Sequence, residues 1–243
     1  MATWREITYM VLDEIKSLNS DSSVTEDHVI FLANHYRLFL LEQKKEKQGV
    51  AALSESNYQT ICLDLEKTSA VPGLDFCTDT YLKSVQEIPT TIDASSTRVY
   101  PINYYSTNTA FVTKDRFKYV GFNPALSNIT YYTLGPDNHV YLKSSNPQFQ
   151  YLKEAKVTGI FEDSEKAAEL ACDKDGEEKC DILDQDFPLE GAMIPQLLEL
   201  IVKELYGTNI RPKDDQNNSA DDMAELVNYV RRNMKSDVAK QLQ

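Results

Sequence analysis

Apolar side chains recur at three- and four-residue spacing near the start of the chain, which predicts two amphipathic helices. The first is expected over residues 3–18, with one face formed by Trp4, Ile7, Val11, Ile15 and Leu18. The second is expected from Thr25 to Leu41, where it meets the charged run EQKKEK. Thr25 is a good N-cap, and two acids follow it in the first turn, where the helix dipole favours negative charge.

Helical spacing returns in the last third of the chain. A short acidic helix is expected within IFEDSEKAAELA. The strongly apolar segment MIPQLLELIVKELYG predicts a longer helix, with Pro195 in or near its first turn and Gly207 as its C-cap. After a polar link, Ser219 is expected to cap a last helix. One face of that helix carries Met223, Leu226, Val227, Val230 and Met234.

Between about residues 57 and 161 the pattern changes to alternating and β-branched runs, which predicts strands. The runs are YQTICLDL, TRVYPINYY, AFVTKDRFKYVGF, NITYYTL and HVYLKS. Residues 136–138 supply the turn of a hairpin within LGPDNHVYL. Eight of the 14 tyrosines lie between Tyr100 and Tyr151. Tyrosine suits a half-buried sheet and is also enriched at protein interfaces, so both interpretations stay open.

The order of helices, strands and helices predicts an α+β fold. Each terminal pair of helices is too short to bury its apolar face alone, so we expect the two pairs to pack together. The strand-rich middle is then an insertion. The prediction is a discontinuous helical bundle formed by residues 1–52 and 162–243, with a β-rich inserted domain formed by residues 53–161.

Composition narrows the possible partners. The 243 residues include 42% hydrophobic and 10% aromatic residues, enough for a real core, and carry a formal charge of −13. Such a charge argues against nucleic-acid capture, which needs a clustered basic surface, and against anionic membranes. No run approaches the roughly 20 apolar residues of a spanning helix, and the first residues lack a signal or transit pattern. We expect a protein that stays in the cytosol.

The four cysteines are expected to remain thiols in that compartment. Cys172 and Cys180 flank a turn and could face each other, but their spacing is not that of a zinc knuckle. Cys62 and Cys77 are not spaced to supply the other two ligands of a zinc site. A zinc site from two or more of these residues, and adventitious oxidation, remain as alternatives.

The three histidines also lack the arrangement of a metal site. His28 and His35 lie on one helix face but about 10.5 Å apart along the axis, too far for one zinc ion. His139 lies beside the predicted hairpin turn and is expected to be a solvent-facing strand residue. The apolar residues around the second helix indicate burial instead, by its own domain or by neighbouring subunits.

Motifs for catalysis are missing from the sequence. The loop ACDKDGEEKCDILDQD resembles a calcium loop but has Ala171 and Ile182 at the first and last ligand positions. Nucleophile elbows, Walker loops and dinucleotide fingerprints do not occur. We therefore predict no catalytic residue, no metal and no cofactor. The alternative is a cytosolic enzyme with an unrecognised carboxylate-based site.

Several long stretches resemble the tail ring proteins of crAss-like bacteriophages, which infect gut Bacteroides. The resemblance covers nearly the whole chain, and its layout is similar to the head–tail adaptors of short-tailed phages. It is carried by TWREITYMVLDEIK, VTEDHVIFLANHYR, VYLKSSNPQFQYLKEAKVTGIFEDSEKAAEL, CDILDQDFPLEGAMIPQLLELIVKEL and DDQNNSADDMAELVNYVRRNMKS.

The resemblance implies a non-enzymatic virion structural protein, assembled in the cytoplasm of the bacterial host. It implies a ring of twelve copies that joins the portal protein to neighbouring tail rings and continues the channel for DNA ejection. Genomic DNA would pass through without specific binding, and an acidic chain suits such a conduit because it does not hold the phosphates. The resemblance implies no catalytic residues to transfer.

Two sets of residues are predicted to contact partners. The second helix has more apolar circumference than one partner helix can cover, so the rest of the bundle is expected to close much of that surface and the next subunit some of it. Phe31 and Phe39 are predicted as the residues of this helix that contact a partner. The last helix ends in a basic group, Arg231, Arg232, Lys235 and Lys240, which is expected to dock on an acidic surface of a neighbour or the portal. Complementing the helix dipole is the alternative role of these charges.

Overall fold

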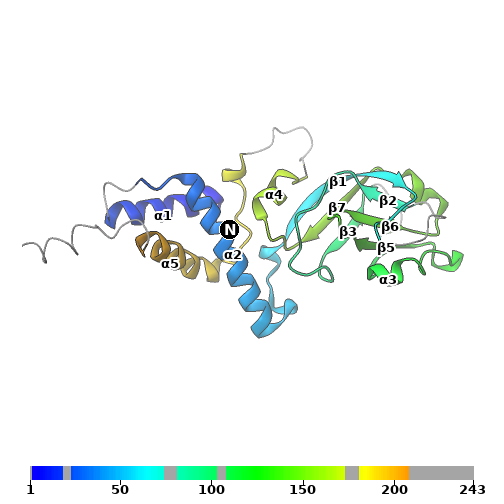
Figure 1. The fold of residues 1–243 in the computed structure, drawn as a ribbon, viewed down its shortest axis with the longest axis horizontal. Helices are drawn as coiled ribbons and strands as arrows, with labels where there is room; N and C mark the ends of the chain where they lie inside the picture. Colours follow the sequence, from blue (N-terminus) through cyan, green and yellow to red (C-terminus); the bar gives the residue numbers. More distant parts are fainter. Residues whose placement is uncertain (1, 19–22, 74–80, 103–107, 173–180, 208–243) are drawn as a thin grey trace, which may run out of the picture.

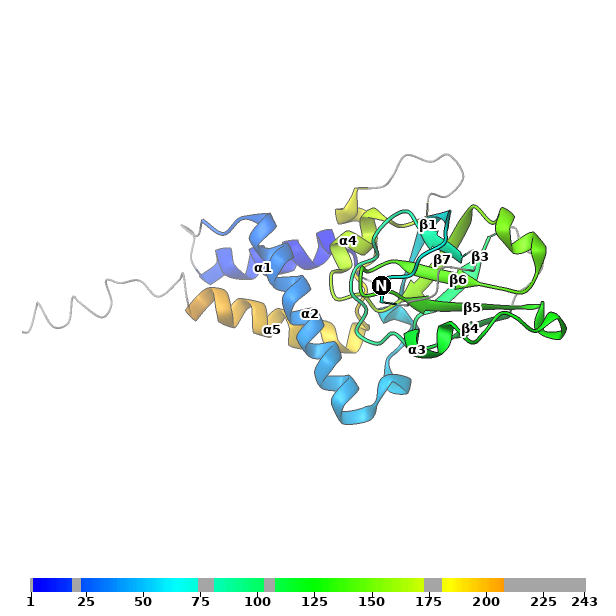
Figure 2. The same ribbon diagram turned by 45° about the vertical axis from the view of Figure 1, so that its right-hand side comes forward.

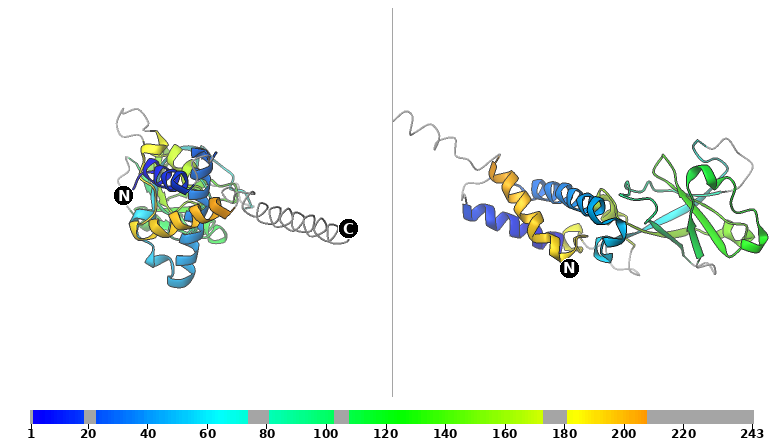
Figure 3. Two further views of the ribbon diagram at one scale, coloured as in Figure 1. Left: turned by 90° about the vertical axis from the view of Figure 1, so that its left-hand side faces the viewer. Right: turned by 90° about the horizontal axis from the view of Figure 1, so that it is seen from below.

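The computed structural model describes residues 2–18, 23–73, 81–102, 108–172 and 181–207. In these ranges the chain has mixed α+β structure, as predicted, with long helices gathered at one end of an elongated molecule and strands at the other (Figure 1 and Figure 3). The last predicted helix, after Ser219, lies outside the described residues.

Three helices pack on one another at the helical end: α1 (Trp4–Leu18), α2 (Glu26–Gln48) and α5 (Ile194–Leu205). Each helix packs apolar side chains against the other two. The Trp4 and Phe187 rings meet edge to face, with centroids 4.6 Å apart. The N-terminal helices therefore do touch a C-terminal one. The shared core includes Trp4, Ile7, Val11, Ile15, Val29, Leu40, Leu41, Phe187, Leu197, Ile201 and Leu205.

The ends of the helices differ in part from the predictions. Thr25 caps α2 as expected, accepting a hydrogen bond from the His28 amide, and Pro195 lies in the first turn of α5. However, α2 continues to Gln48 because its charged residues have distant partners. Lys44 Nζ lies 2.5 Å from Glu190 Oε1, and Lys45 Nζ donates to a backbone carbonyl. Helix α5 ends earlier than predicted, with Tyr206 rather than Gly207 in the C-cap position.

Seven strands form one nearly closed sheet in the order β3-β7-β1-β2-β6-β5-β4. They are β1 (Gln59–Thr68), β2 (Tyr81–Ser84), β3 (Arg98–Pro101), β4 (Asn108–Phe111), β5 (Ile129–Leu134), β6 (Val140–Lys143) and β7 (Glu154–Gly159). Strand β1 pairs with β7 along its first six residues and with β2 along its last four. At the far edges, the Tyr132 hydroxyl donates to the Thr97 carbonyl, which brings β5 close to the start of β3.

Two short helices flank the sheet: α3 (Lys114–Phe117) and α4 (Ser164–Glu169). The first corrects a prediction, because the run AFVTKDRFKYVGF was expected to be one strand. Only its first two residues belong to β4, which ends at Phe111, and the chain then turns into α3 beside β5 (Figure 2). Phe117 from this helix is buried against Tyr81 and Tyr141, so tertiary packing overrides the strand-like composition.

The hairpin between β5 and β6 forms as predicted. Asn138 adopts a positive φ of 55°, and the Gly135 amide donates to the His139 carbonyl across the turn. His139 itself corrects a prediction, because it is buried rather than facing solvent. It precedes β6, whose four residues are all buried, and its Nδ1 lies 2.8 Å from the Ser84 carbonyl oxygen.

The prediction that all four cysteines remain thiols is also wrong, because Cys62 and Cys172 form a disulfide. After α4 the chain returns beside β1, where the Cys62 amide donates to the Leu170 carbonyl at 2.9 Å. This pairing brings two cysteines together that are 110 residues apart in sequence. Cys77 and Cys180 lie outside the described residues.

A fully buried arginine joins the two ends of the molecule. Arg37, on α2, donates from Nε to the Pro188 carbonyl and from Nη1 to the Phe161 carbonyl, both at 2.9 Å. Burial lowers the pKa of its guanidinium to about 9, partly opposed by the nearby Asp163 carboxylate, so the group is a cation at neutral pH. One side chain therefore holds α2 to the chain leaving β7 and to the segment that precedes α5.

Arg37→Met should lower the free energy of unfolding by about 2–5 kcal/mol, because it leaves two buried carbonyls without their donor. Urea unfolding followed by circular dichroism measures this change. Arg5→Met is the matched control, since the Arg5 ion pair with Asp184 lies at the surface, where solvent screening leaves it only a small contribution to stability. Equal losses in the two variants would contradict the role given to Arg37.

Loss of the disulfide should also destabilise the fold. Cys172→Ser should lower the free energy of unfolding by about 2–5 kcal/mol, because the cross-link closes a long loop in the unfolded chain. Thermal unfolding of the parent with and without reductant should reproduce the difference. Cys77→Ser serves as the control and should behave like the oxidised parent. Four reactive thiols in the denatured, unreduced parent would show that the disulfide is absent.

Candidate partner interface

Helix α2 presents an aromatic stripe to solvent, formed by Phe31, His35 and Phe39. These residues are four positions apart, so they lie on one face of the helix. The Phe31 and His35 rings stack with centroids 6.5 Å apart and planes 8° apart. Phe31 is 67% exposed and Phe39 48% exposed, although both are large apolar side chains. The two sequence-predicted contact residues therefore lie together on an open surface.

The opposite side of α2 faces the core. Its buried residues are Val29, Leu32, Ala33, Arg37, Leu40 and Leu41. The sequence predicted that this helix is enclosed by its own domain or by neighbouring subunits. Within the described part of the chain, its own domain covers only the Arg37 side and leaves the aromatic stripe open.

The two histidines of α2 make different contacts, His28 through its backbone amide and His35 through its ring. The His28 amide is the donor to the Thr25 cap, and the His35 ring lies between Phe31 and Tyr36. In the described ranges, no group of three or more histidine, cysteine, aspartate or glutamate side chains is arranged to hold a metal ion. In the same ranges, no helix is both long enough and apolar enough to cross a membrane.

The basic group predicted to dock on a partner cannot be placed. Arg231, Arg232, Lys235 and Lys240 all lie outside the described residues.

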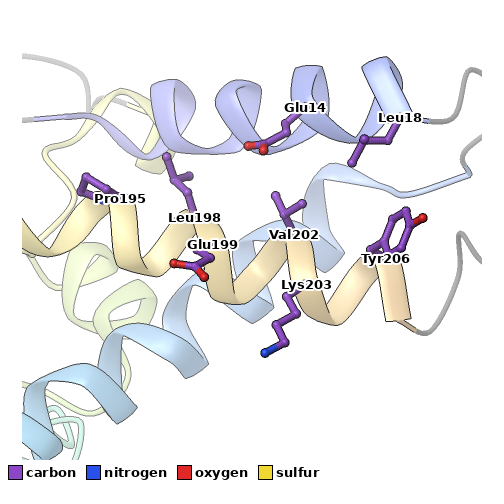
Figure 4. A pocket seen from close by; sticks show the side chains of 8 residues that line it. All are labelled: Glu14, Leu18, Pro195, Leu198, Glu199, Val202, Lys203 and Tyr206. Carbon is purple, nitrogen blue, oxygen red and sulfur yellow. The ribbon is translucent and has the colours of Figure 1, made fainter.

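A second open apolar surface, which the sequence did not single out, is a groove between α1 and α5. It has a volume of about 610 Å³ (Figure 4). Leu18 from α1 and Leu198 and Val202 from α5 face one another across it. Pro195 and Tyr206 lie at its two ends, and Glu14, Glu199 and Lys203 complete the lining. The sequence did contain a sign of this groove, because the apolar residues of α5 occupy more of the helix surface than one core contact requires.

The strand end has its own exposed rings. Tyr119, Phe122 and Leu126 are exposed in the connection between α3 and β5, and Lys143 Nζ lies 3.6 Å from the centre of the Phe122 ring. Such a contact between a cation and an aromatic face holds the ring in place at the surface.

The tyrosines of the strand-rich middle divide into buried and exposed residues. Tyr132 and Tyr141 are buried in the sheet, and burial raises the pKa of Tyr132 to about 12. The Tyr141 hydroxyl donates to Asp137, and with Lys83 this bond lowers the pKa of that carboxyl despite its partial burial. Tyr100 and Tyr151, in contrast, are exposed.

These surfaces fit a protein that binds other proteins. Large exposed rings and an open apolar groove are features of interaction sites rather than of a closed monomer.

Comparison with known proteins gives the family. Residues 6–223 match the family described as phage tail ring protein 2. The chain is also 43% identical over 226 residues to "Ring protein 2" of Bacteroides phage crAss001, which spans 92% of this chain and 99% of that relative. The resemblance seen in the sequence is thereby confirmed: the chain belongs to the phage tail ring protein 2 family, whose members are structural components of the phage tail.

Proposed function

We propose that this protein assembles into a closed ring that joins the portal to the tail and continues the channel for DNA ejection. The family match over residues 6–223 is the observation that carries the proposal. A closed cyclic assembly requires two different patches on each subunit that fit together head to tail. Twelve copies is the number that we propose, since the portal and its adaptors share that symmetry in the phages that the sequence resembles.

The aromatic stripe is proposed as one patch of the subunit interface. Phe31 and Phe39 are held at fixed positions by a helix whose other face is packed in the core. Rings presented on a rigid element lose little conformational entropy when a partner covers them, and aromatic anchors of this kind dominate the energy of many interfaces.

The charge of the chain supports the proposed conduit. With 38 acidic and 25 basic residues, an assembled ring carries a large negative charge. DNA passing through such a ring meets repulsion rather than an attractive surface that would slow its exit. We therefore propose that genomic DNA passes through without specific binding, and that the protein has no catalytic role.

The basic end of the last predicted helix is proposed as a docking surface for a neighbouring subunit or the portal. Rim charges of this kind mainly increase the association rate and make it sensitive to salt. The other possibility is that Arg231, Arg232 and Lys235 only complement the dipole at the end of their own helix.

Phe31→Glu combined with Phe39→Glu should prevent ring formation while the subunit still folds, because two carboxylates would be buried at the interface. Sedimentation velocity and negative-stain electron microscopy report ring formation, and circular dichroism reports folding. Tyr151→Glu is the control, because it adds a charge at an exposed ring outside the stripe and should leave rings intact. Intact rings from the folded double variant would exclude the stripe as an interface.

Reversing Arg231, Arg232 and Lys235 to glutamate should weaken association with the ring or the portal, most clearly at low salt, while the monomer still folds. Binding kinetics at two salt concentrations measure the effect. If the triple variant associates like the parent at low salt, the charges serve the helix dipole alone.

A further inference from the structure

The groove between α1 and α5 has an apolar lining that the described part of the chain leaves open. Leu18 is 53% exposed and Tyr206 is 46% exposed, although both carry large apolar groups. On α5, Leu198 and Val202 are one helical turn apart and line the groove, while Leu197, Ile201 and Leu205 are fully buried in the core. Helix α5 is therefore built to contact apolar partners on two sides.

We propose that the chain's own C-terminal segment, residues 219–240, packs into this groove as a fourth helix. The segment has the required chemistry, because Met223, Leu226, Val227, Val230 and Met234 recur at helical spacing on one face. This inference does not depend on ring formation.

The geometry of the groove suits this occupant. Helices α1 and α5 run in the same direction, so Leu18 and Tyr206 lie at the same end of the groove (Figure 4). The described chain stops at Gly207, immediately beyond that end. Residues 208–218 form a link longer than the roughly 2–8 residues that usually join antiparallel helices. A helix that starts at Ser219 can therefore reverse and run back along the groove.

The lengths of the two apolar surfaces also agree. On α5, the residues that line the groove extend from Pro195 to Tyr206. The apolar face of the C-terminal segment extends from Met223 to Met234, the same number of residues. Each surface is about 16.5 Å long at 1.5 Å per residue.

Charge favours the antiparallel direction. With the two surfaces aligned end to end, an antiparallel helix places Arg231 level with Leu198, one residue from Glu199, and Asp222 about one helical turn beyond Lys203. A parallel helix would place Arg231 level with Lys203. In the antiparallel arrangement Arg232 points away from the apolar face and stays free for the docking surface proposed above.

A second copy of the chain could offer the same helix, but covalent linkage favours the segment of the same chain. A flexible link of this length holds its two ends at a local concentration on the order of millimolar, well above that of a free subunit in solution. The proposal therefore commits to an intramolecular contact.

Photo-crosslinking of the full-length protein tests the proposal. Tyr206→p-benzoylphenylalanine puts a reactive group in the groove, and the same substitution at Tyr9 gives a matched control. Tyr9 is a tyrosine of nearly equal exposure, 47%, on α1 and outside the groove. After irradiation, peptide mass spectrometry should find links from position 206 to residues 219–240 in a species of monomer mass. The control position should give none.

A pair of variants adds a check on the apolar face. Leu226→Asp with Val230→Asp should abolish the link from position 206, whereas Asn228→Asp with Tyr229→Asp should retain it. The second pair adds the same number of carboxylates away from the apolar face. Links found only in a species of dimer mass would assign the groove to a neighbouring copy and overturn the proposal. So would a parent-like link in the Leu226 and Val230 variant, or no link to residues 219–240.

Discussion

The buried Arg37 cation is the constraint on which the arrangement of the helical end depends. Its guanidinium is fully buried, and two carbonyl oxygens from distant parts of the chain accept hydrogen bonds from Nε and Nη1 in place of water. Nη2 has no hydrogen-bond partner among the described residues. The helix cannot rotate about its axis without leaving that charge unsolvated. Phe39 follows Arg37 by two residues, about 200° around the helix. Holding Arg37 inward therefore turns Phe39 and the stacked rings before it to the outside.

The same constraint explains what the sequence could and could not predict. Spacing alone identified the inner face of α1, because a helix buries one stripe whatever lies opposite. It did not define a single buried face for α2, since apolar residues surround most of that helix, although it named Phe31 and Phe39, which the structure exposes, as partner contacts. The deciding signal was the lone Arg37, whose partners Phe161 and Pro188 lie more than 120 residues away. Long-range contacts also explain the errors at Lys44, His139 and Cys62.

The two open apolar surfaces at the helical end are proposed to make different contacts. The aromatic stripe on α2 is rigid and faces away from the core, which suits contact with another subunit. The groove between α1 and α5 lies where the described chain ends, which suits the chain's own C-terminal segment. The sheet is held to these helices through Arg37, so contacts made at the helical end also position the exposed rings around Phe122. The sequence singled out Phe31 and Phe39 of the aromatic stripe but not the groove.

The most direct test of the proposed ring is a cryo-electron microscopy reconstruction of the assembled particle at side-chain resolution. The account predicts a closed ring in which Phe31 and Phe39 of each subunit are covered by the adjacent copy. A ring in which both rings face solvent, with subunits joined through another surface, would contradict it.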